Sequence, residues 1–87
     1  MSDVMTVLKY PLATEKAISL IDRNNIITYI ADFRATKTEI KKEFEAQFGV
    51  KVEKIRAVNT TANTKKVYIK IAKGFKASDV ARKLKLV

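Results

Sequence analysis

The sequence contains no cysteine and no histidine. The lack of cysteine excludes disulfide bonds, thiolate catalysis and cysteine-ligated zinc. The lack of histidine excludes the usual general base near neutral pH and imidazole metal ligands. Glycine is also scarce, because Gly49 and Gly74 are the only two, and no glycine-rich phosphate loop is present. We therefore expect a protein that is not an enzyme and that needs no metal and no cofactor.

Long apolar runs are absent as well. No stretch approaches the roughly 18 apolar residues that a membrane-spanning helix requires. The segment from Met1 to Lys9 contains Asp3, has no basic cluster and has no hydrophobic region of a signal peptide. These features predict a cytoplasmic protein with no membrane insertion of its own.

What the sequence does contain is positive charge. Its 87 residues include 18 Lys and Arg against 9 Asp and Glu, a formal net charge of +9. Residues 1–33 hold three basic and four acidic side chains, residues 34–56 hold seven and four, and residues 57–87 hold eight basic side chains and only Asp79. Solubility alone would explain a basic protein, but it gives no reason for this concentration in the last third. The distribution favours a binding surface for an anionic partner.

The first half of the chain shows a strand, a helix and a second strand. Val7 to Tyr10 is expected to be extended and to end at Pro11. Thr14 is a candidate N-cap for a helix over Glu15 to Asp22. Ile26 to Phe33 follows as a strand, in which alternation predicts one apolar face, made of Ile27, Tyr29, Ala31 and Phe33, opposite Thr28 and Asp32.

The second half begins with the helix whose ends are best defined. Thr36 and Glu39 form a capping box, Ile40, Phe44 and Phe48 make an apolar stripe, and Gly49 ends the helix. Val50 to Val58 is expected to be a strand with a bulge or a strong twist near Glu53 and Lys54, because its alternation changes phase there. A polar loop over 59–65 leads to a strand over 66–72. Ser78 is a candidate cap for a last helix that carries Val80, Ala81 and Leu84.

This order predicts an α+β fold. The elements run strand, helix, strand, helix, strand, strand, helix, and the last two strands are close enough in sequence to form a hairpin. We expect an antiparallel sheet of three to four strands with helices packed on it. We expect residues 1–87 to form a single domain.

The hairpin region carries the strongest sign of RNA binding. Its lysines suit phosphate contacts, and its uncharged Asn and Thr side chains suit ribose and phosphate hydrogen bonds. Tyr68 shares a strand face with Lys66 and Lys70, and it either stacks on a base or serves as an ordinary cross-strand aromatic. Arg34 and Lys37 form a second cluster at the start of a helix, where simple solvation is the alternative. The predicted RNA-binding residues are Lys9, Tyr10, Lys16, Arg34, Lys37, Asn59, Thr60, Thr61, Asn63, Lys65, Lys66, Tyr68, Lys70, Lys73 and Lys76.

Four segments resemble a known family in the expected order. The first, Pro11 to Ala17, reads Pro-Leu-Ala-Thr-Glu-Lys-Ala and resembles the Pro-x-x-[Ser/Thr]-Glu-Lys opening of the large-subunit ribosomal protein twenty-three family. Further similar segments are Arg34 to Lys41, Val50 to Val52 followed by Val58-Asn59-Thr60, and the closing strand Lys65 to Ile71. The resemblance covers nearly the whole chain.

The resemblance implies a role in the large ribosomal subunit. Members of this family bind large-subunit ribosomal RNA at the rim of the polypeptide exit tunnel, beside neighbouring ribosomal proteins. They help to form a docking platform for the signal recognition particle, the translocation channel and, in bacteria, a tunnel-exit chaperone. Glu15 matches the glutamate of the family motif that takes part in docking, and a plain first-turn helix carboxylate is its alternative. The loop over 59–65 is too short to reach deep into the tunnel, as in the archaeal and eukaryotic form of the family.

Two other classes of protein stay open at this point. One is a free-standing RNA-binding regulator, and the other is a protein-interaction module with a basic face for acidic partners. The sequence gives no sign of an obligate homo-oligomer.

Overall fold

A computed structural model describes residues 8–60 and 64–84. Its elements are β1 (Leu8–Pro11), α1 (Glu15–Asn24), β2 (Ile26–Asp32), α2 (Lys37–Phe48), β3 (Val52–Asn59), β4 (Thr64–Ile71) and α3 (Ala77–Lys83). The strands form one antiparallel sheet in the order β1-β2-β4-β3. The predicted α+β class, the antiparallel sheet and the element order are confirmed.

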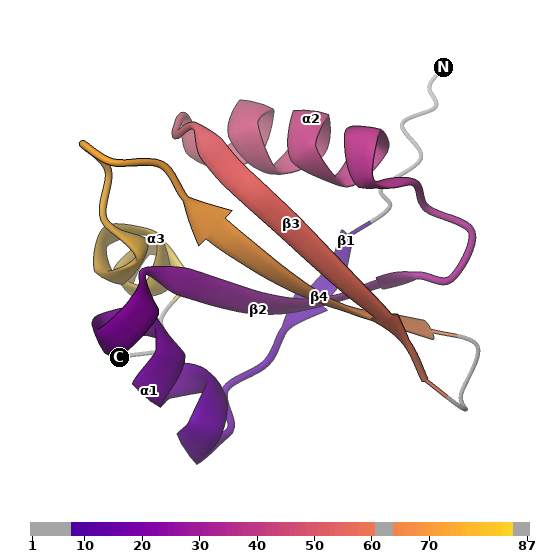
Figure 1. Ribbon diagram of the computed structural model, residues 1–87, viewed down its shortest axis with the longest axis horizontal. Coiled ribbons are helices and arrows are strands. Elements are labelled where there is room, and N and C mark those ends of the chain that lie inside the picture. The colour runs from indigo at the N-terminus through magenta and orange to yellow at the C-terminus, as the bar shows by residue number, and fades with distance from the viewer. Residues whose placement is uncertain (1–7, 61–63, 85–87) are drawn as a thin grey trace.

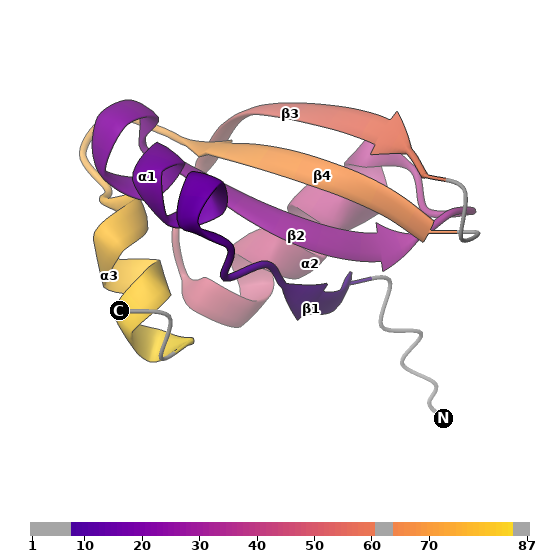
Figure 2. The same ribbon diagram turned by 90° about the horizontal axis from the view of Figure 1, so that it is seen from below.

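The two faces of the sheet are covered unequally (Figures 1 and 2). Helix α2 lies along one face, and α1 lies on the opposite side, over only one end of the strands. Helix α3 packs at the same end and contacts both α1 and β2. Much of the face opposite α2 is therefore left without a covering helix, and this uncovered part is called the open face below.

The core lies between the sheet and helices α2 and α3. The predicted stripe of Ile40, Phe44 and Phe48 is buried against the sheet, and the Tyr29 ring meets that of Phe44 edge-on with centroids 6.3 Å apart. Burial raises the pKa of the Tyr29 hydroxyl, and the charge of Glu43 adds to this effect. The buried residues of this core include Leu8, Ile27, Ala31, Val52, Val67, Ile69, Ile71, Val80 and Ala81.

Local signals fixed the ends of α1 and α2. The Thr14 hydroxyl accepts a hydrogen bond from the Ala17 N–H, and the Thr36–Glu39 capping box is complete. Gly49 ends α2 with a φ of 67°, a left-handed conformation that costs glycine little. The predicted irregularity at the start of β3 is also confirmed, because the register with β4 shifts between Val52 and Lys54.

Phe33 was wrongly expected on the buried face of β2. The strand ends at Asp32, because the Asp32 carboxylate accepts the Arg34 backbone N–H at 2.9 Å and its carbonyl accepts that of Ala35 at 2.9 Å. This side-chain-stabilised turn takes the chain out of the sheet. Phe33 is consequently 47% exposed. Thr28 lies on the opposite face as expected, but it is buried, at 2% exposure.

Ser78 was wrongly expected to cap α3. The helix begins at Ala77, its N-cap is Lys76, and no side chain of the cap residue bonds its first turn. The Ala77 N–H instead donates to the side-chain oxygen of Asn25 at 2.6 Å. Asn25 also donates to the carbonyls of Ile71 at 3.1 Å and Phe75 at 3.0 Å. One side chain in the α1–β2 turn therefore fastens the β4–α3 connection.

Candidate nucleic-acid interface

The open face carries a groove of about 580 Å³. Its floor is made of strand residues that alternate away from α2, and one wall is the exposed side of α1. The register places Arg56 of β3 opposite Tyr68 of β4, with Thr28 of β2 on the other side of Tyr68. The groove is lined by Lys16, Leu20, Ile26, Lys54, Arg56, Val58, Tyr68 and Lys70.

Helix α1 contributes Lys16 and Leu20 to the groove. Thr14 starts this helix by accepting the Ala17 N–H at 3.2 Å, and burial of Ala17 and Ile21 holds its other side against the protein. Lys16, one residue into the helix, is exposed beside the sheet. The family-like motif at the start of α1 thus supplies both the cap and one cation of the groove.

Positive charge dominates the groove. Four of its eight lining residues are Lys or Arg and none is acidic. Lys54 lies directly opposite Lys70, and like charges at such positions destabilise a sheet. The Lys66 ammonium lies 5.6 Å from the centre of the Tyr68 ring, within range of a cation–π interaction. The arrangement attracts anions, and an anion that neutralises the lysines relieves their repulsion.

The sequence interpretation missed Lys54 and Arg56. Both are exposed on β3 and line the groove with Lys70. The sequence pattern does predict their position. The phase change near Glu53 turns Ile55 and Ala57 inward, so Lys54 and Arg56 turn outward.

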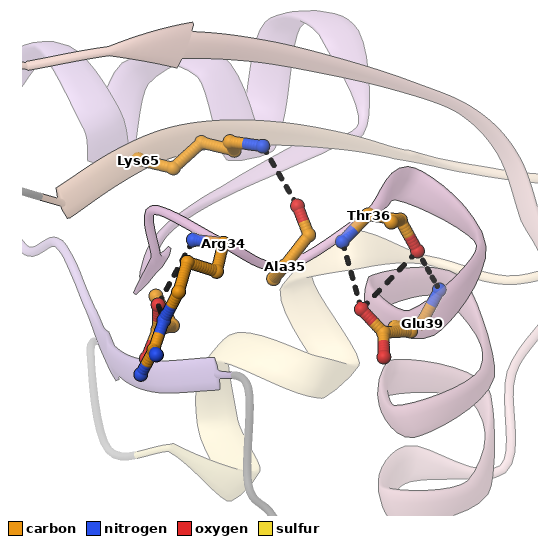
Figure 3. Close-up of polar contacts among 6 residues, drawn as sticks. Arg34, Ala35, Thr36, Glu39 and Lys65 are labelled. Atoms are coloured by element: carbon orange, nitrogen blue, oxygen red, sulfur yellow. Dashed lines mark hydrogen bonds and ion pairs between the residues drawn. The ribbon is translucent and has the colours of Figure 1, made fainter.

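Lys65 and Lys66 are neighbours in sequence but point to opposite faces of the sheet. The Lys65 ammonium crosses to the α2 side and donates to the Ala35 carbonyl at 2.7 Å (Figure 3). Lys66 lies on the open face, beside Tyr68. The structure therefore brings Lys16, Lys66, Tyr68 and Lys70 together among the predicted residues and sets Lys65 apart.

The hairpin end holds the predicted polar residues. Asn59 is exposed and pairs with Lys65 across the β3–β4 ladder. The Thr60 hydroxyl is 3.0 Å from the Thr64 carbonyl and 2.6 Å from the Thr64 hydroxyl, so it helps to close the hairpin. Thr61 and Asn63 lie outside the described residues. The two strands leave only residues 60–63 between them.

The second basic cluster is at the start of α2. The Arg34 guanidinium is 3.5 Å from the Asp32 carboxylate and 5.6 Å from the centre of the Phe33 ring. The Arg34 backbone N–H, followed by its side chain and the charge of Lys9, lowers the pKa of Asp32. Lys37 is exposed. However, the capping box (Figure 3) already hydrogen-bonds the backbone N–H groups of Thr36 and Glu39 at the start of the helix, so these groups are not open to an anion. This cluster is less free to take an anion than the groove is.

The remaining predicted residues lie around the edges. Lys9 and Tyr10 are exposed on β1, where Tyr10 pairs with Ile30. Lys73 and Lys76 are exposed in the β4–α3 connection, at the end of the sheet opposite the hairpin. Glu15 is exposed at the start of α1.

The described residues offer little for other chemistry. Over residues 8–60 and 64–84, no group of three or more acidic side chains could hold a metal ion. No helix in the same ranges has the length and apolar character needed to cross a membrane.

The chain is similar to known proteins. Residues 6–83 match the family model described as Ribosomal protein L23. The chain is 40% identical over 85 residues to the large ribosomal subunit protein uL23 of Trypanosoma brucei brucei. This alignment covers 98% of the chain and 52% of the relative, so the chain spans about half the length of that protein.

Proposed function

Since the chain belongs to the ribosomal protein L23 family, we propose that it is a structural constituent of the large ribosomal subunit and binds its ribosomal RNA through the groove of the open face. The family is a non-enzymatic one, and its members are cytoplasmic ribosomal components. Ribosomal RNA and neighbouring ribosomal proteins are the partners that follow from this role.

The observation that carries the proposal is the cross-strand pair of Lys54 and Lys70. The two residues are partners in the β3–β4 register, and both line a groove that has no acidic lining residue. A fold selected for stability alone gains nothing from this pair. A phosphate group bound between the two lysine side chains would turn the repulsion into attraction, and the exposed Lys16 and Arg56 would add further contacts.

Binding is then a matter of assembly rather than chemistry. Each Lys or Arg that neutralises a phosphate releases condensed counterions, so affinity falls steeply with salt. Phosphate contacts of this kind position the protein on RNA without reading its sequence. We expect residues 1–87 to act in this way as one RNA-binding domain.

A second part of the proposal concerns docking at the polypeptide exit tunnel. Glu15 is exposed at the first position of α1, in a part of the chain whose net charge is slightly negative. Its carboxylate is available to a basic partner such as the signal recognition particle or the translocation channel. The short connection over 60–63 fits the archaeal and eukaryotic form, in which the hairpin does not reach deep into the tunnel.

Sedimentation tests the ribosomal role. An epitope-tagged chain is expressed in its host, and the extract is run through a sucrose gradient at high salt. We expect the protein to travel with the large subunit. A protein found at the top of the gradient, but still bound to RNA, would instead support a free-standing regulator.

Docking is tested separately with Glu15→Ala, and Asp22→Ala on the same helix is the matched control. Ribosomes carrying Glu15→Ala are expected to bind the signal recognition particle more weakly while the protein stays on the subunit. Loss of the protein from the subunit would mean that Glu15 has a structural role only.

A further inference from the structure

We propose that the groove holds a single unpaired nucleotide, with its base against Tyr68 and its flanking phosphates among the lysines and arginine. This inference rests on the proposed function and goes beyond it, because phosphate contacts alone do not distinguish paired from unpaired RNA. It names the conformation of the RNA that the open face selects.

The groove has an apolar part that phosphate binding does not need. Leu20 of α1, Ile26 of β2 and Val58 of β3 line it together with the cations, and the Val58 side chain is 48% exposed. Apolar surface inside a strongly basic face suits a ligand that is itself partly apolar and partly anionic. An unpaired nucleotide has this character, because its base has two apolar faces and its backbone is charged.

Tyr68 is placed to meet such a base. It lies on β4, the strand between β2 and β3, and its half-buried side chain lines the groove. Lys66 lies 5.6 Å from the ring centre, and Arg56 is directly opposite in the register. A base that stacks on this ring brings its phosphates within reach of both cations. Aromatic stacking combined with neighbouring positive charge is how proteins commonly hold single-stranded nucleic acid.

The size of the groove limits the ligand. A volume of about 580 Å³ is within the range of small-molecule sites, which leaves room for one nucleotide. In a double helix the faces of the bases are stacked on one another and are closed to protein side chains. A bulged or looped-out nucleotide next to a helix presents a free base while keeping phosphates on both sides.

The test compares two RNA hairpins of about 12 base pairs that differ only in one bulged adenosine. Binding of the full chain is measured by fluorescence anisotropy over a range of salt concentrations, and 2-aminopurine at the bulge reports stacking. We expect the bulged hairpin to bind more tightly, and we expect the 2-aminopurine emission to change on binding. Tyr68→Ala should weaken binding of the bulged hairpin about 5- to 100-fold. Tyr68→Phe should retain the preference.

The outcomes separate the inference from the proposed function. Equal binding of both hairpins with a steep salt dependence, unchanged by Tyr68→Ala, would overturn the nucleotide site and leave RNA binding intact. Equal loss of both hairpins in Tyr68→Ala would also overturn it, provided that circular dichroism shows a folded variant. Binding of neither hairpin by the parent chain would count against the proposed function itself.

Discussion

Lys54 of β3 and Lys70 of β4 lie directly opposite each other in the antiparallel register. Their repulsion works against the fold, and the same pair favours binding of an anion. Stability and RNA affinity should therefore respond in opposite directions when either charge is removed.

The first prediction uses this opposition. Lys70→Gln should raise the free energy of unfolding by about 0.2 to 1 kcal/mol, because a like-charge cross-strand pair is removed. The same variant should lower the salt slope of RNA binding by about 0.7 to 0.9, the value of one phosphate contact. Urea unfolding and salt titration of an RNA fragment measure the two effects. Lys42→Gln, at an exposed position of α2, is the control. Equal salt slopes of RNA binding for the two variants would mean that the RNA does not contact Lys70.

The second prediction separates Lys65 from Lys66. Lys65→Met removes the hydrogen bond to the Ala35 carbonyl and should cost about 1 to 2 kcal/mol of stability with little effect on the salt slope. Lys66→Met should keep stability within about 0.5 kcal/mol and weaken RNA binding. A triple change of Lys65, Lys66 and Lys70 to Glu would combine both effects. If Lys65→Met flattens the salt slope as much as Lys66→Met, the assignment of faces is wrong.

The contrast between these two lysines shows what the sequence could predict. Alternation along β4 placed Lys66, Tyr68 and Lys70 on one face correctly, because strand periodicity is a local property. The predicted loop over 59–65 wrongly included Lys65, because β4 begins at Thr64, and Lys65 was therefore grouped with the other lysines of the hairpin. The partner of Lys65 is a carbonyl 30 residues away in sequence, which no local pattern shows.

The errors in the fold have the same origin. The capping box of Thr36 and Glu39 was predictable because both partners lie within one helical turn. The first turn of α3 depends on Asn25, which is 52 residues from Ala77, so Ser78 looked like the better cap. The groove is formed by β3 with its shifted register and by helix α1 beside the sheet. The sequence pattern predicts the change of register, but it does not predict where α1 packs.

The third prediction concerns Thr28. Among the residues that the structure describes, its hydroxyl is the buried side-chain group without a hydrogen-bond partner. An unsatisfied buried hydroxyl costs stability, so the similarly shaped Thr28→Val should raise the free energy of unfolding by about 1 kcal/mol. Chemical denaturation provides the value, and Thr38→Val at an exposed position of α2 is the control. A loss of stability in Thr28→Val would show that the hydroxyl is hydrogen-bonded in solution.

The fourth prediction concerns acid. The pKa of Asp32 is lowered in the folded chain from its ordinary 3.8, chiefly by the Arg34 backbone N–H. A lowered pKa stabilises the fold above the ordinary value, and this stabilisation disappears as the pH falls through the folded pKa. Between about pH 6 and pH 2 the parent chain should therefore lose more stability than Asp32→Asn. Thermal unfolding across this range measures the difference, and parallel curves would show that Asp32 does not contribute.

The fifth prediction separates two properties of Asn25. Its backbone is left-handed, with a φ of 59°, and its side chain makes three hydrogen bonds. Asn25→Gly keeps the backbone conformation accessible and should cost about 2 to 4 kcal/mol from the lost bonds. Asn25→Ala should cost about 1 kcal/mol more, because alanine also resists this conformation. Equal losses in urea unfolding would mean that the backbone conformation costs nothing here.

The bonds of Asn25 also bear on the order of events during synthesis. They join residues that are 46 to 52 positions apart, and β2 also pairs with the later strand β4. A growing chain can form α1 and α2 early, since their signals are local. It cannot complete the sheet until β4 has emerged from the ribosome that makes it, and it cannot fasten α3 until Ala77 has followed. The open face therefore forms only after β4 has been translated, later than the two helices whose signals are local.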